Sequence, residues 1–142
     1  MTWEPTARQA EFLAASEEEV LFGGAAGGGK SDALVVDALG LAHDAILRPR
    51  YRALLIRRTL PEAREIIDRS RALYPRVAEG ATFHEQDKEW RFPSGAKVMF
   101  GYCERDADVY RYQGAEFQWI GVDELGHFGS PYVWEYLTSR LR

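Results

Sequence analysis

Residues 20–31 read Val-Leu-Phe-Gly-Gly-Ala-Ala-Gly-Gly-Gly-Lys-Ser, and this stretch decides the fold. It satisfies G-x-x-x-x-G-K-[ST], the pattern of a phosphate-binding P-loop. Glycines let the backbone wrap closely around a phosphate, because no Cβ blocks the approach and positive φ angles are tolerated. The pattern predicts a nucleotide-phosphate cradle formed by Gly24, Ala25, Ala26, Gly27, Gly28, Gly29, Lys30 and Ser31.

The flanking residues favour this interpretation over a glycine linker that matches the pattern by chance. Residues 20–22 are apolar and predict a short buried strand, and residues 31–42 predict a helix. Strand, loop and helix in this order are the context that a P-loop requires. Lys30 is then expected to contact the β- and γ-phosphates of ATP, and the hydroxyl of Ser31 to bind Mg²⁺.

The composition is that of one globular domain without a membrane segment. The chain has 142 residues, of which 46% are hydrophobic, enough to bury a core. No apolar run is long enough to span a membrane, and the N-terminal residues do not resemble a signal peptide. The single cysteine, Cys103, excludes an internal disulfide, which fits a reducing cytoplasm.

Charge is distributed unevenly along the chain. The net charge is −4, yet residues 48–76 hold nine arginines against three acidic residues, a local charge of +6. Two interpretations stay open for this segment: a solvated helix face with local ion pairs, or a surface that faces phosphates or a neighbouring subunit. Under the second, the arginines should gather on one surface.

The middle of the chain predicts a strand followed by a helix. Residues 53–56 are apolar between two arginines, as in a buried strand. Thr59 and Glu62 fit a helix capping box with proline in the first turn, and Pro75 is expected to end that helix. One face of the helix is expected to be buried, through Ala63, Ile66, Ile67, Ser70 and Tyr74.

The remaining elements complete an α/β pattern. Residues 89–92 and 97–102 alternate in polarity around a turn and predict an antiparallel hairpin. Residues 117–122 predict another buried strand, and a helix is expected after Ser130. The fold class is therefore α/β: a P-loop NTPase of the ASCE or RecA-like type, with a mainly parallel sheet, flanking helices and an inserted antiparallel hairpin.

Two carboxylates follow the strand predicted at residues 117–122. Ligands of open α/β sheets bind at the carboxyl ends of the strands, where Asp123 and Glu124 lie. We expect Asp123 to hold Mg²⁺ in the Walker B role and Glu124 to activate the attacking water. An acidic turn is the simpler explanation of the pair, but a complete P-loop upstream favours the functional one.

Gln9 has two possible roles that its position does not separate. It lies three residues after Thr6 and can complete a capping box for a helix at residues 5–15. Its amide can instead recognise adenine, whose edge offers one donor and one acceptor.

Several segments together resemble the large terminase subunit of tailed bacteriophages. They are the glycine-rich loop at residues 22–31, Arg57-Arg58-Thr59, Tyr112-Gln-Gly-Ala-Glu-Phe117, residues 119–125 and Ser139-Arg-Leu-Arg142. The P-loop and the Asp-Glu pair occur in many NTPases, whereas the combination with the other segments is far more specific. The resemblance covers residues 5–142.

The resemblance implies the N-terminal ATPase domain of a motor that packages double-stranded DNA. In that family, a ring of subunits at the portal protein of a procapsid works with a small terminase subunit in the bacterial cytoplasm. A separate C-terminal domain is the nuclease, and its motifs are not found in this chain. By similarity, Gln9 recognises adenine, Lys30 and Ser31 bind phosphate and Mg²⁺, Asp123 is the Walker B acid and Glu124 the catalytic glutamate.

The sequence departs from the family in two ways. Many relatives carry an arginine inside the P-loop where this chain has Ala25 and Ala26, so the charge is expected from Arg57, Arg58, Arg140 or a neighbouring subunit. The chain also ends before the family's coupling motif and nuclease, so it resembles an N-terminal fragment, for which the resemblance does not imply ATP hydrolysis by the fragment alone. Another DNA-dependent P-loop ATPase, such as a helicase or recombinase, and a non-hydrolysing assembly module are the alternatives.

Overall fold

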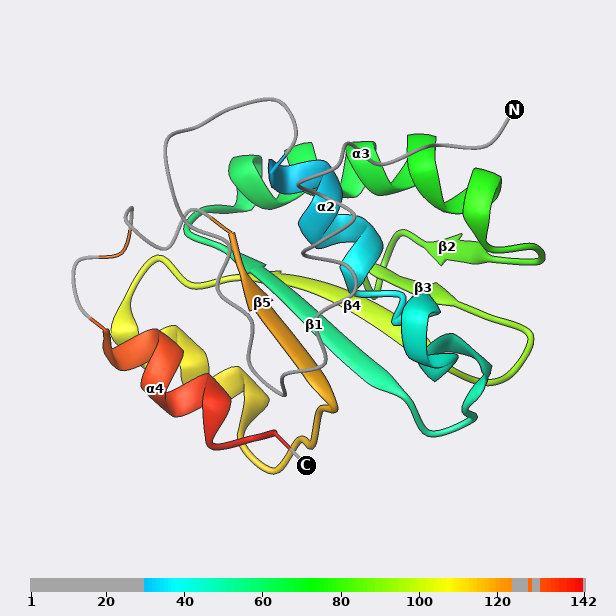
Figure 1. The fold of residues 1–142 in the computed structure, drawn as a ribbon. Coiled ribbons are helices and arrows are strands. Elements are labelled where there is room, and N and C mark those ends of the chain that lie inside the picture. The colour runs from blue at the N-terminus through cyan, green and yellow to red at the C-terminus, as the bar shows by residue number, and fades with distance from the viewer. Residues whose placement is uncertain (1–29, 124–127, 129–130, 142) are drawn as a thin grey trace.

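The protein is built on a five-stranded mixed sheet, shown in Figure 1. The computed structural model describes residues 30–123, 128 and 131–141. The strand order is β2-β3-β4-β1-β5, with β1 parallel to both β4 and β5, and β2 and β3 antiparallel to their neighbours. The strands are β1 (Arg52–Arg57), β2 (Thr82–His84), β3 (Glu89–Arg91), β4 (Lys97–Tyr102) and β5 (Trp119–Val122).

Helical elements cover both faces of this sheet. Helices α2 (Lys30–Asp37) and α3 (Leu60–Val77) lie side by side on one face. The 3₁₀ segment η3 (Asp106–Tyr112) and helix α4 (Tyr132–Thr138) pack together on the other face. Two short 3₁₀ turns, η1 (Leu41–His43) and η2 (Ala45–Leu47), connect α2 to the strand β1.

Alternation along the central strand divides the core into two clusters. Ala53 and Leu55 belong to the cluster under α2 and α3, whereas Leu54 and Ile56 belong to the cluster under η3 and α4. All four side chains are completely buried. A parallel strand covered on both faces is expected to be apolar at every position, which is why residues 53–56 predict it so clearly.

Helix α3 confirms its predicted beginning and buried face but not its predicted end. The Thr59 side chain caps it by accepting a hydrogen bond from the Glu62 N–H at 3.3 Å. The prediction that Pro75 ends the helix is wrong, because the helix continues to Val77. Proline removes only one backbone donor, and the helix still closes with a 2.8 Å bond from the Ala78 N–H to the Tyr74 carbonyl, while Val77 packs on the core.

The predicted antiparallel hairpin is confirmed as β3 and β4, and a further strand, β2, pairs with β3. The turn closes through a 2.9 Å bond from the Gly95 N–H to the Phe92 carbonyl. The short strand β2 pairs antiparallel with β3 and was not predicted, because its three residues are too few to show a pattern.

Two other boundaries differ from the predictions. Strand β5 begins at Trp119, and Phe117 instead forms an isolated bridge with Leu141. Helix α2 ends at Asp37 rather than at residue 42, because Gly40 adopts a left-handed conformation with φ of 61° and turns the chain away.

Several predicted elements lie outside the described residues. These are the helix at residues 5–15, the strand at 20–22, the loop at 24–29 and the cap at Ser130. The α/β class with parallel central strands and an antiparallel hairpin is confirmed. Among the described strands the sheet is mixed rather than mainly parallel, because the hairpin and β2 add two antiparallel pairs to the two parallel pairs of β1. In the described part of the chain, no helix combines the length and apolar character needed to cross a membrane.

Candidate active site

Three segments that are distant in sequence meet at the carboxyl ends of β1 and β5. Arg57 is the last residue of β1, Asp123 follows the last residue of β5, and Ser31 lies in the first turn of α2. The Asp123 N–H donates to the Ile56 carbonyl at 3.0 Å, which continues the sheet pairing by one residue and fixes the backbone of Asp123. This end of a parallel sheet is where α/β proteins bind ligands.

Asp123 accepts two side-chain hydrogen bonds on one oxygen. The Ser31 hydroxyl donates to Asp123 Oδ2 at 2.9 Å, and the Arg57 Nε–H donates to the same oxygen at 2.8 Å. Asp123 is 3% exposed and Arg57 5% exposed, so both charges are buried. A buried carboxylate with these two partners is held in one position and compensated by one positive charge.

The two-residue period of the strands explains why these side chains meet. Arg57 continues the series of Ala53 and Leu55 on the face under α2 and α3. Asp123 likewise continues the series of Trp119 and Gly121 on β5, while Ile120 and Val122 point into the opposite cluster. Both charged residues therefore face α2, whose first residue is Lys30.

A second contact fixes the other end of α2. The Trp119 indole N–H donates to Asp37 Oδ2 at 2.8 Å, so α2 is bound to β5 near its first and at its last residue. Gly121 makes room for the indole, because a Cβ there would lie 2.3 Å from the Trp119 ring. The sequence analysis did not identify Asp37 or Trp119. Trp119 lies four positions before Asp123, so the two-residue period of a strand could have placed both on the same face of the sheet.

Asp37 has an unusual environment for a carboxylate. Burial raises its pKa to about 6, and the hydrogen bond from Trp119 and the nearby His43 only partly oppose this shift. The ordinary pKa of aspartate lies near 4, so Asp37 pays a desolvation cost when it ionises at neutral pH.

The donor chemistry of Ser31 and Asp123 fits Mg²⁺. A hydroxyl and a carboxylate are hard oxygen ligands, and the hydrogen bond between them places both on the same side of the sheet end. Within residues 30–123, 128 and 131–141, no group of three or more His, Cys, Asp and Glu side chains forms a metal site. Two protein ligands suit Mg²⁺, which commonly completes its shell with water and substrate phosphates.

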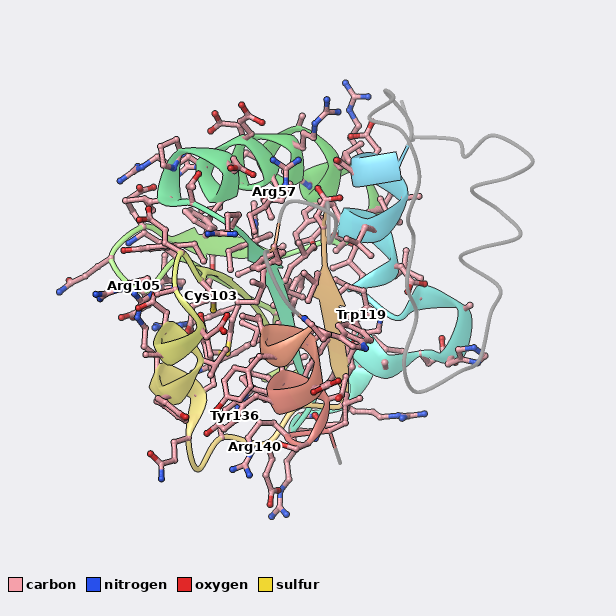
Figure 2. The ribbon with its side chains drawn as sticks, turned by 90° about the vertical axis from the view of Figure 1, so that its left-hand side faces the viewer. Arg57, Cys103, Arg105, Trp119, Tyr136 and Arg140 are labelled. Carbon is pink, nitrogen blue, oxygen red and sulfur yellow. The ribbon has the colours of Figure 1, made fainter. Side chains whose placement is uncertain are left out.

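The three candidate arginines lie in different places. Arg57 is buried in its own chain, where it pairs with Asp123, so its burial opposes a role as a finger in a neighbouring site. Arg58 is half-buried, with its guanidinium 5.8 Å from the centre of the Phe128 ring. Figure 2 shows Arg140 at the opposite end of the sheet from Arg57.

Arg140 therefore does not complete the site of its own chain. Its carbonyl accepts from the Phe117 N–H at 2.9 Å, before the beginning of β5. Asp123 lies six positions after Phe117, about 20 Å along an extended chain and beyond the reach of an arginine side chain.

The basic segment does not form one surface, so that prediction is wrong. Arg52 begins β1 and donates to the carbonyls of residues 49, 51 and 95, whereas Arg57 ends the same strand. On α3, Arg64 and Arg71 pair with Glu85, and Arg69 pairs with Asp32 at 2.6 Å. Local ion pairs thus account for much of this positive charge.

The other predicted site residues are not tested by the geometry. Residues 24–29, Gln9 and Glu124 lie outside the described residues, and for Lys30 the structure gives only its place as the first residue of α2. Their roles stay predictions. The residues that the structure does bring together are Ser31, Asp123 and Arg57.

Comparison with known families identifies the chain. Residues 21–139 match the family model described as terminase large subunit, T4likevirus-type, N-terminal. Searches of curated proteins and of solved structures found no match. Because the family model spans far more than half of the chain, this protein belongs to the family of the N-terminal region of terminase large subunits of the T4-like virus type.

Proposed function

We propose that this chain is the ATPase part of a viral DNA-packaging motor, which couples ATP hydrolysis to the movement of double-stranded DNA into a procapsid. The observation that carries the proposal is the 2.9 Å hydrogen bond between Ser31 and Asp123. It joins the residue after the P-loop lysine to the acid at the end of a parallel strand, 92 positions later. The family assignment supports the same function.

The proposed nucleotide site extends from this pair onto the P-loop. Backbone N–H groups of Gly24, Ala25, Ala26, Gly27, Gly28 and Gly29 bind the phosphates, and Lys30 adds a positive charge. Ser31 and Asp123 hold Mg²⁺, which neutralises phosphate charge when it is bound. Gln9 contacts the adenine ring.

Glu124 is the proposed general base. It follows Asp123 directly in the sequence. A carboxylate within reach of a water molecule can orient it and accept its proton as it attacks the γ-phosphate. Asp123 is already bound to Ser31 and Arg57, which leaves the water to its neighbour.

The proposed partners follow from the family. They are double-stranded DNA, the small terminase subunit, the portal protein and further copies of this chain in a ring, in the cytoplasm of a bacterial host. The arginine that acts in phosphoryl transfer is proposed to be Arg58, or one from a neighbouring subunit. Arg57 forms an ion pair with Asp123 of its own chain.

Phosphate release from Mg²⁺-ATP by the assembled full-length protein tests the proposal. Glu124→Gln should bind ATP normally but lower turnover by about 10²–10⁴-fold, because an amide cannot accept the proton. Glu135→Gln, an exposed change on α4, is the matched control and should behave as wild type. Normal turnover in Glu124→Gln would refute the role of Glu124, and nucleotide binding without turnover in the wild type would identify a binding module instead of an ATPase.

A further inference from the structure

Arg57 has a contact that the ATPase role of the site does not require. Its Nε–H donates to the same Asp123 oxygen that accepts from Ser31. Within the described part of the chain, it is the cation that pairs with Asp123. A positive charge thus lies directly on the carboxylate that is proposed to hold a divalent cation.

The other end of the Arg57 guanidinium faces α3. Nη1 lies 3.4 Å from Glu65 Oε2 and 3.8 Å from Glu62 Oε2. The Glu65 side chain is 71% exposed and the Glu62 side chain 26% exposed, so this end of the cluster reaches solvent. With Asp123, three carboxylates of the described residues lie around the Arg57 guanidinium.

We propose that Arg57 is an internal counter-ion of Asp123 that neutralises the buried carboxylate when no divalent cation is bound and competes with such a cation for it. The inference rests on the proposed function, because that function assigns Mg²⁺ to Asp123. Arg57 acts through Asp123 and is a positioning residue.

Arg57 should stabilise the site without a divalent cation and destabilise the site with one, for two physical reasons. A carboxylate that is 3% exposed is costly to ionise without a partner, so Arg57 stabilises the cation-free protein. A guanidinium on the ligand repels a dication over a few ångströms, so Arg57 also weakens cation binding. Glu62 and Glu65 offer the guanidinium alternative partners as its bond to Asp123 loosens.

The sign of the effect on Mg²⁺ affinity separates this role from a merely structural one. In thermal melts of the full chain with MgCl₂ alone, Arg57→Gln should melt lower than wild type without Mg²⁺. Its melting temperature should also rise more than that of wild type when Mg²⁺ is added. The Mg²⁺ concentration that gives half of this rise should be at least about fivefold lower than for wild type. A structural role predicts a lower melting temperature with an unchanged or weaker response to Mg²⁺, and that result would overturn the proposal.

Arg64→Gln is the matched control. Arg64 is an exposed arginine on α3 whose pair with Glu85 is 3.8 Å long, so the change removes the same charge from the same region without touching Asp123. Its Mg²⁺ response should equal that of wild type. If Arg64→Gln tightened Mg²⁺ as much as Arg57→Gln, general charge would explain the effect and the proposal would fail.

A double variant keeps the test decisive if Arg57→Gln does not fold. Arg57→Gln with Asp123→Asn leaves no buried charge at this position, so it should recover most of the lost stability and lose the Mg²⁺ response. A double variant as unstable as the single one would overturn the counter-ion role. The ATPase proposal is judged separately by phosphate release from the wild type, which these melts do not measure.

Discussion

At the scale of single residues, the site depends on one carboxylate with two defined donors. Asp123 accepts hydrogen bonds from Ser31 and Arg57 on the same oxygen. Asp123 is held in place and charge-compensated, whereas Glu124 lies outside the described residues. We propose that the two acids divide the work of the site.

This division predicts different phenotypes for the two acids. Asp123→Asn should weaken Mg²⁺-dependent ATP binding about 10-fold or more, because the amide loses the negative charge that the cation and Arg57 require. Binding of ATP in EDTA should change much less. The measurement is ATP affinity with and without Mg²⁺. If Asp123→Asn kept full Mg²⁺ dependence and lost only hydrolysis, the roles of Asp123 and Glu124 would be reversed.

At the scale of secondary structure, α2 is bound to β5 at both ends. Ser31 bonds to Asp123 near one end, and Asp37 bonds to Trp119 at the other. These two contacts hold α2 against β5 and against Asp123, the residue that follows it. The contact at Asp37 has a cost that depends on pH, since burial raises its pKa to about 6.

Asp37→Asn tests that cost. Because the folded pKa lies above the unfolded value, the contribution of Asp37 to stability is complete below pH 4 and is lost as the pH rises through 6. Asparagine can still accept from Trp119, so the variant should be more stable than wild type at pH 7.5, by about 1–3 kcal/mol, with no gain near pH 4.

Urea unfolding at several pH values measures this difference. Asp68→Asn, an exposed change on α3, is the matched control and should show no such pH dependence. Equal stability of Asp37→Asn and wild type at all pH values would show that Asp37 is not desolvated in the folded protein.

The same elements show what the sequence could and could not predict. Strand β1 and the capped helix α3 were predictable, because a run of apolar residues and the Thr59–Glu62 cap are local signals. The last turn of α3 was not, because packing of Val77 on the core outweighs the local effect of Pro75. The end of α2 was missed although Gly40, a local signal, marks it.

Some features of the candidate site were predictable from the sequence and others were not. The position of Asp123 at the end of the sheet was predictable, because it directly follows a run of buried strand residues. Its bond to Arg57 was not, because it depends on two parallel strands with 66 residues between the partners. The arrangement of the basic segment was also mispredicted, since net charge in sequence does not tell which arginines form ion pairs.

At the scale of the whole molecule, the first turn of α2, Asp123 and Arg57 meet at one end of the sheet. Arg140 lies at the other end, as Figure 2 shows. This arrangement fits a domain that binds nucleotide at the carboxyl ends of its parallel strands. We propose that this end of the sheet binds Mg²⁺-ATP.

Calorimetric titration of the full chain with a non-hydrolysable ATP analogue, with and without Mg²⁺, tests that claim most directly. The account predicts Mg²⁺-dependent binding by wild type that falls at least about 10-fold in Lys30→Ala, because the phosphates lose a positive charge inside the backbone cradle. Lys97→Ala, a change at the half-exposed first residue of β4, is the control and should bind as wild type does. Folded wild type that does not bind the analogue, or Lys30→Ala that binds it equally well, would contradict the account.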